Sequence, residues 1–90
     1  MPVITFANTK GGAGKTTAVL ILAGELARQG YRITILDADP QHWISRWHEL
    51  SGDVPNISVI SYVTMASIQQ HIEENRAHTD CFIIDLPGAR

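Results

Sequence analysis

The stretch Lys10-Gly11-Gly12-Ala13-Gly14-Lys15-Thr16-Thr17 lies between an apolar run and a segment with helical periodicity. Glycine-rich loops of this kind bind phosphate, because bare backbone N–H groups can wrap an anion that bulky side chains would block. The common pattern is Gly, four arbitrary residues and then Gly-Lys-Ser/Thr, and residue 9 should be its first glycine but is Thr9. The loop follows instead a variant that opens on a second lysine, Lys10. The sequence therefore predicts a phosphate-binding loop, and the extra lysine indicates that two copies of the chain act together.

The composition predicts one globular domain over residues 1–90, with 44% hydrophobic residues and a net charge of −2. Such a balance gives no basic footprint for nucleic acid. A single cysteine, Cys81, excludes a disulfide framework and is expected to be a small apolar residue at the start of a strand. No basic leader or bilayer-length apolar run is visible, so we expect a cytoplasmic protein without a membrane partner. The four histidines are scattered without a ligand-like cluster, and we expect them to be solvated: His42, His48, His71 and His78.

Strand-like and helix-like segments alternate along the chain. Apolar and β-branched runs predict strands at residues 3–8, 32–37, 57–63 and 81–86. Apolar residues at spacings of three and four predict helices at residues 15–29, 41–50 and 64–77. This alternation predicts an α/β fold, in which flanking helices cover both faces of a parallel sheet. Three helices for four strands give thin cover.

Local residues support these helix boundaries. Gly30 is placed to end the first helix, Pro40 suits the first turn of the second, and Thr64 can cap the third. Large apolar residues of the second helix fall along one face: Trp43, Ile44, Trp47 and Leu50. We interpret its tryptophan pair as core packing or a protein contact rather than a platform for bases. In the third helix we expect three residues to face inward: Met65, Ile68 and Ile72.

Acidic residues follow two of the predicted strands. Asp37 and Asp39 come at the end of the second strand, and Asp85 ends the fourth. Ligands of an open parallel sheet bind at the carboxyl ends of its strands, so the loop and the acids are expected to converge there. Each feature alone has an ordinary explanation, since Asp-Pro pairs often start helices and acids often end strands. Their coincidence in order predicts a site.

The loop residues suit a nucleotide. Gly11, Gly12 and Gly14 allow the main chain to approach a phosphate closely, and the helix that begins near Gly14 presents free N–H groups to it. Lys15 can supply charge to the β- and γ-phosphates, and the Thr16 hydroxyl can coordinate Mg²⁺.

The acids suit the metal and the attacking water. Mg²⁺ keeps most of its waters, and Asp85 is placed to hold them. Asp37 and Asp39 are two residues apart on an extended segment and need not share a task. One could help to hold the waters of Mg²⁺ while the other orients the water that attacks the γ-phosphate.

Taken together, residues 10–17, Asp37-Ala38-Asp39-Pro40-Gln41 and residues 82–88 resemble the ParA family of deviant Walker A ATPases. These proteins partition plasmids and chromosomes and are relatives of the Min-system ATPase. The resemblance covers essentially the whole chain and implies a P-loop NTPase fold that binds ATP and Mg²⁺.

The resemblance also assigns roles. It implies a homodimer that forms on ATP binding, in which Lys10 reaches the phosphates of the partner's nucleotide as an arginine finger would. The remaining loop residues Gly11, Gly12, Ala13, Gly14, Lys15, Thr16 and Thr17 would bind the nucleotide. Asp39 would position the attacking water, and Asp37 and Asp85 would sit at the hydration shell of the magnesium.

Members of this family are usually more than twice as long, so the resemblance implies an N-terminal portion with an incomplete βαβαβαβ sheet. The remainder would carry the surface for nonspecific DNA and much of the dimer face, and a centromere-binding partner would stimulate the ATPase. Such a protein would associate with the nucleoid. Two alternatives stay open: another deviant Walker A ATPase, for example a MinD-like one, or a truncated, non-catalytic nucleotide-binding or interaction module.

Overall fold

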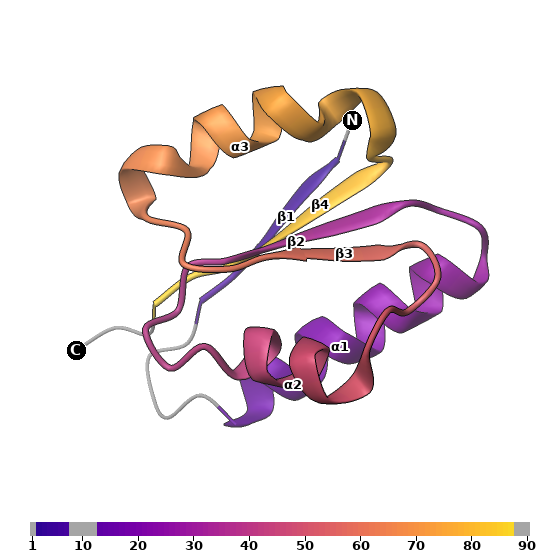
Figure 1. Cartoon of the computed structure of the whole chain (residues 1–90), viewed down its shortest axis with the longest axis horizontal. Coiled ribbons are helices and arrows are strands. Elements are labelled where there is room, and N and C mark those ends of the chain that lie inside the picture. The colour runs from indigo at the N-terminus through magenta and orange to yellow at the C-terminus, as the bar shows by residue number, and fades with distance from the viewer. Residues whose placement is uncertain (1, 8–12, 88–90) are drawn as a thin grey trace.

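The computed structural model describes residues 2–7 and 13–87. Within these ranges a parallel β-sheet lies between two helical layers, with α1 and α2 on one face and α3 on the other (Figure 1). The strands are β1 (Val3–Phe6), β2 (Ile33–Asp37), β3 (Ile57–Ile60) and β4 (Cys81–Asp85). The helices are α1 (Ala13–Arg28), α2 (Trp43–Ser51) and α3 (Ile68–Asn75), and 3₁₀ turns at Met65–Ser67 and Arg76–His78 flank α3. The predicted α/β class with a parallel, helix-flanked sheet is confirmed.

The strand order β1-β4-β2-β3 places β4 between the first and second strands. All neighbouring pairs are parallel, and Asp85 at the end of β4 is in register with Phe6 of β1 and Asp37 of β2. The segments that follow these three strands therefore leave the sheet at the same edge. Alternation of strands and helices did not predict this order, because it leaves the neighbours of each strand open.

The start of α2 differs from the prediction. The helix begins at Trp43 rather than Gln41, because the chain first makes a turn in which the His42 N–H donates to the Asp39 carbonyl at 3.0 Å. His42 itself has a left-handed backbone with φ 56°, which a right-handed helix cannot contain. The residues that follow β2 are therefore held in a tight turn before the helix starts.

The other predicted boundaries are partly right. Gly30 ends α1 with φ 95°, and the Tyr31 N–H donates back to the Leu26 carbonyl, as in a glycine-terminated helix. Thr64 caps the turn before α3, since its hydroxyl accepts from the Ser67 N–H. The regular part of α3 is shorter than predicted, because both of its ends tighten into 3₁₀ turns.

Two apolar cores fill the two faces of the sheet. Alternate residues of β2 and β4 point to opposite faces, as the pleat requires. The core beneath α1 and α2 is built from Val19, Ala23, Ile33, Ile35, Ile44, Ile57, Cys81 and Ile83. The smaller core beneath α3 is built from Leu36, Ala38, Val63, Phe82 and Ile84, with Ile68 and Ile72 half-buried against it. The expected place of Cys81, buried at the start of a strand, is confirmed.

The apolar face predicted for α2 is right for Ile44 and wrong for Trp43 and Leu50. Ile44 and Ser45 are its buried residues, while Leu50 is 89% exposed and Trp43 lies on the surface beneath the Arg46 guanidinium. The buried face is rotated by about one residue, or roughly 100°, because Ser45 turns inward to a buried carboxylate. Core packing is therefore wrong for Trp43, although Trp47 is half-buried.

Met65 was also predicted to face inward and is 64% exposed. It lies in the 3₁₀ turn ahead of α3, whose three-residue period does not continue the face of the α-helix. Among the described helices, none is long and apolar enough to cross a membrane.

A candidate nucleotide site at the carboxyl ends of the strands

Lys15 lies at the centre of the candidate site. It belongs to the first turn of α1, and its side chain is only 3% exposed. The ammonium is 2.5 Å from Asp39 Oδ2 and 3.0 Å from Asp85 Oδ1, and it also donates to the Leu86 carbonyl. The structure thus brings the lysine of the loop together with an acid from each of the other two motifs.

Burial and charge act in opposite directions on these three groups. Burial alone would lower the pKa of Lys15, but the carboxylates of Asp39 and Asp85 outweigh it, so that pKa is raised. Burial alone would raise the pKa of Asp39, but Lys15 and the Gln41 N–H hold it below its usual range. For Asp85 burial prevails, and its pKa is raised. Lys15 and Asp39 therefore form the better-stabilised charged pair, while the charged form of Asp85 is the less stabilised of the two carboxylates.

Three buried oxygens at this site have no hydrogen-bond partner that meets the usual geometry among the described residues: Thr16 Oγ1, Asp85 Oδ2 and Asp85 Oδ1, of which the last lies 3.0 Å from the Lys15 ammonium as an ion pair. Buried polar atoms are nearly always satisfied, so orphaned ones need an explanation. A hard divalent cation takes oxygen ligands of this kind, and Mg²⁺ takes few of them from protein because it retains waters. The described residues accordingly contain no cluster of three His, Cys, Asp or Glu side chains that could hold a metal ion alone. Thr16 and Asp85 fit magnesium beside a bound nucleotide.

Asp37 differs from Asp85. It is fully buried, and protein donors reach both of its oxygens. Its Oδ1 accepts from the Asp39 N–H at 3.3 Å, and its Oδ2 accepts from Ser45 through both the N–H at 3.1 Å and the hydroxyl at 2.5 Å. The amino-terminal end of α2 thus holds this carboxylate, as expected for an anion at the positive end of a helix.

Residues 4–86 match the family described as the CobQ/CobB/MinD/ParA nucleotide binding domain. The chain belongs to this family. It is 42% identical over 89 residues to protein ParA of Rhizobium radiobacter, a match that covers 98% of this chain and 40% of that protein.

Two proteins of Thermus thermophilus are also similar. The chain is 47% identical over 61 residues to a probable plasmid-partitioning protein ParA, covering 68% of this chain and 19% of that protein. It is 55% identical over 38 residues to the chromosome-partitioning ATPase Soj, covering 42% of this chain and 15% of that protein. The chain thus spans two fifths or less of the length of these relatives. The resemblance to the ParA family and the P-loop NTPase fold are confirmed.

Part of the phosphate-binding loop of this ParA-type chain lies outside the described residues. Lys10, Gly11 and Gly12, with the roles predicted for them, lie outside those ranges. Ala13 and Gly14 are the first residues of α1. A Cβ placed on Gly14 would meet no described atom within 4 Å, so packing against the described residues does not require glycine there. The roles assigned to residues 10–17 remain predictions.

Ser45 and His42 are two residues whose part in the site the sequence did not indicate. Ser45 falls within the helix that the sequence predicts at residues 41–50, and no spacing rule connects it to Asp37. His42 was predicted to be solvated, yet its ring packs against that of Tyr62, with centroids 4.4 Å apart and ring planes tilted by 55°, and its Nδ1 is buried. That prediction is wrong for His42, because the tight turn after Asp39 folds the ring back toward the sheet. Its left-handed φ of 56° is matched by 57° at Tyr62.

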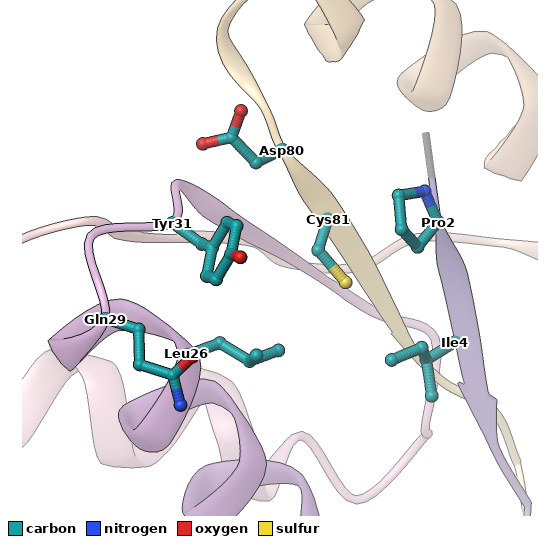
Figure 2. Close-up of a pocket in the computed structure, with 7 residues that line it drawn as sticks. All are labelled: Pro2, Ile4, Leu26, Gln29, Tyr31, Asp80 and Cys81. Carbon is teal, nitrogen blue, oxygen red and sulfur yellow. The ribbon is translucent and has the colours of Figure 1, made fainter.

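A hollow of about 470 Å³ lies far from this site, at the other end of the sheet. Figure 2 shows it between the end of α1 and the first residues of β1 and β4, with Leu26, Ile4 and Cys81 on its walls. The amino ends of parallel strands are not where such folds bind ligands. The hollow is therefore separate from the Lys15 cluster.

Proposed function

We propose that the protein binds and hydrolyses ATP and acts in DNA segregation as a homodimer that forms on ATP binding. The observation that carries this proposal is the burial of Lys15 between Asp39 and Asp85, three charged side chains from three motifs at one edge of the sheet. Membership of the family supports the proposal that the protein binds a nucleotide. Relatives named for plasmid and chromosome partitioning support the proposal that it acts in DNA segregation.

The residues at this edge have separate roles in the proposed phosphoryl transfer. The loop N–H groups and the amino-terminal end of α1 bind the phosphates, and Lys15 leaves the two carboxylates to neutralise charge on the β- and γ-phosphates. Thr16 and Asp85 would hold Mg²⁺, which when bound supplies positive charge to the same phosphate oxygens. Asp39, released by Lys15, orients the attacking water toward the γ-phosphate.

The partner subunit completes the site in this proposal. Lys10 of one copy stabilises charge on the nucleotide of the other, in the manner of an arginine finger. A centromere-binding protein and nonspecific DNA stimulate turnover, and the protein works in the cytoplasm on the nucleoid. Proteins of this kind would need surfaces beyond residues 1–90 for DNA and for much of the dimer contact.

The test is ATP binding and hydrolysis by the full-length gene product, with and without DNA and the centromere-binding partner. We expect Lys10→Ala to bind ATP as the wild type does and to lose stimulated turnover. Arg28→Ala is the matched control, since it removes a positive charge from an exposed pair on α1. Unchanged stimulation in Lys10→Ala would remove the role of the partner's lysine. If DNA does not change the ATPase rate of the wild type, the protein is better explained as another ATPase of the family. A wild type that binds no ATP would refute the proposal.

A further inference from the structure

A chain of buried hydrogen bonds connects α2 to Asp39, the residue proposed to orient the attacking water. Ser45 donates its N–H and its hydroxyl to one oxygen of Asp37, and the other oxygen accepts from the Asp39 N–H. Asp37 is fully buried, and Ser45 and Asp39 are each 5% exposed. Hydrogen bonds to a buried charge are among the stronger ones in proteins, so this chain can fix main-chain geometry.

Asp39 depends on these bonds most when nucleotide is bound. In the structure the Asp39 Oδ2 is held by Lys15, and its Oδ1 accepts from the Gln41 N–H at 2.9 Å. Once Lys15 turns to the phosphates, one of these two restraints on the carboxylate is lost. The Gln41 N–H and the link from the Asp39 N–H to Asp37 then remain among the contacts seen here.

We propose that Ser45 is a positioning residue for ATP hydrolysis, acting through Asp37 on the main chain of Asp39. The inference rests on the proposed ATPase function. It gives Asp37 a different task from the one that the family resemblance implies: Asp37 serves the turn at residues 39–42, and not the hydration shell of the metal. Donors of the protein already occupy both of its oxygens, whereas Asp85 Oδ2 has no partner among the described residues and Asp85 Oδ1 has only the Lys15 ammonium at 3.0 Å, which would leave for the phosphates.

The expected effect follows from the geometry of attack. Removing the Ser45 hydroxyl takes away the 2.5 Å bond to Asp37 and leaves a single donor on that oxygen. A displacement of about 1 Å at a reacting group can cost about 100-fold in rate. We expect kcat to fall by about 10- to 100-fold in Ser45→Ala, while KM for ATP stays within about twofold because the loop and Lys15 carry binding.

The experiment measures kcat, KM for ATP and the half-saturating Mg²⁺ concentration of the full-length gene product. Ser45→Ala should lower kcat alone, and Ser45→Thr, which keeps a hydroxyl donor, should restore most of it. Ser51→Ala is the matched control, because Ser51 is an exposed serine at the end of the same helix. Asp37→Asn should lower kcat without changing the half-saturating Mg²⁺ concentration. Full turnover in Ser45→Ala, or a tenfold rise in the Mg²⁺ requirement of Asp37→Asn, would overturn the proposal.

A second readout does not depend on turnover. In nucleotide-free protein, the amide resonances of Asp39 and Gln41 should shift in ¹H–¹⁵N spectra of Ser45→Ala and stay in place in Ser51→Ala. Unshifted amides overturn the link between Ser45 and Asp39 even if the wild type is a good ATPase. A wild type without ATPase activity, by contrast, removes the proposed function and the catalytic role of Ser45 with it, whether or not the amides move.

Discussion

Replacing Lys15 with Met should destabilise the nucleotide-free protein strongly. The change removes the ammonium that lies 2.5 Å from Asp39 and 3.0 Å from Asp85, and leaves two buried carboxylates facing each other. Removing one partner of a buried ion pair typically costs about 3–5 kcal/mol. A chain of this size has a free energy of unfolding of about 5–13 kcal/mol, so the loss is a large share of it. The midpoint of thermal unfolding should fall by at least about 12 °C.

The loss should also depend on pH in a defined direction. Without Lys15, burial and mutual repulsion raise the pKa of Asp39 and Asp85 in the folded state above their unfolded values. Groups with raised pKa are neutral in the fold at low pH and destabilise it as pH rises through those values. The difference between variant and wild type should therefore be larger at pH 7.5 than at pH 5.

Urea and thermal unfolding, followed by circular dichroism and by the two tryptophans of α2, measure these differences. Arg28→Met is the control, because it breaks an exposed pair with Glu25 on the same helix and should leave the free energy of unfolding nearly unchanged. Asp39→Asn in the Lys15→Met background should recover part of the lost stability, since it removes one of the repelling charges. A Lys15→Met protein as stable as the wild type at pH 7.5 would refute the buried ion pair.

The remaining predictions concern single side chains. Asp39→Asn should bind ATP about tenfold more tightly in equilibrium binding, because Lys15 no longer has to leave that carboxylate, but the variant should not hydrolyse ATP. Weaker binding would contradict the proposal that Lys15 exchanges Asp39 for the phosphates. Cys81, whose pKa is raised by burial, should react with iodoacetamide at pH 8 far more slowly in the folded than in the urea-unfolded protein, and equal rates would contradict its burial. Arg32 lowers the pKa of Asp80 through a side-chain hydrogen bond. The stabilisation of the fold by this pair is therefore present above about pH 4 and is lost as pH falls through the lowered pKa. In Asp80→Asn the free energy of unfolding should depend less on pH in this acid range. Phe82→Ala should lower the free energy of unfolding by about 3–5 kcal/mol, because Phe82 is fully buried beneath α3; a loss below 1 kcal/mol would contradict that core.

The sequence predicted the sheet well because its signals are local and strong. Short apolar runs flanked by helical segments leave a parallel α/β sheet as the simple solution, and that solution is confirmed. The sequence did not predict the strand order, because the position of β4 between β1 and β2 depends on which neighbour each strand meets. Glycine and threonine signals at Gly30 and Thr64 marked real helix ends, because one needs a positive φ and the other offers a cap.

The errors came where a polar contact overrode apolar periodicity. In α2 the spacing predicted one apolar face of Trp43, Ile44, Trp47 and Leu50. Of these only Ile44 is buried, because the helix also turns Ser45 inward toward Asp37. A serine carries little weight in a search for apolar stripes. His42 was misjudged for a related reason, since a polar residue after a proline turn is usually solvated.

For the candidate site, the sequence predicted that these acids lie at one end of the sheet, but not how their contacts differ. Spacing alone left Asp37 and Asp39 open to either of two tasks. Their surroundings separate them: Asp37 is satisfied by α2 and by its own turn, whereas Asp39 is paired with Lys15. Such a difference arises from packing across the sheet and has no signature in a five-residue motif.

The contacts of Lys15 also explain how its charge is tolerated in a buried position. A buried ammonium needs negative partners, and in the structure Asp39 and Asp85 occupy that role. The phosphates of ATP would compete with these carboxylates for the same lysine. Binding would therefore separate Lys15 from Asp39 in the same event that brings the γ-phosphate within reach, and the water-orienting carboxylate would be freed only when its substrate is present. Ser45 and Asp37 are then needed because they hold Asp39 in place after its strongest partner has left.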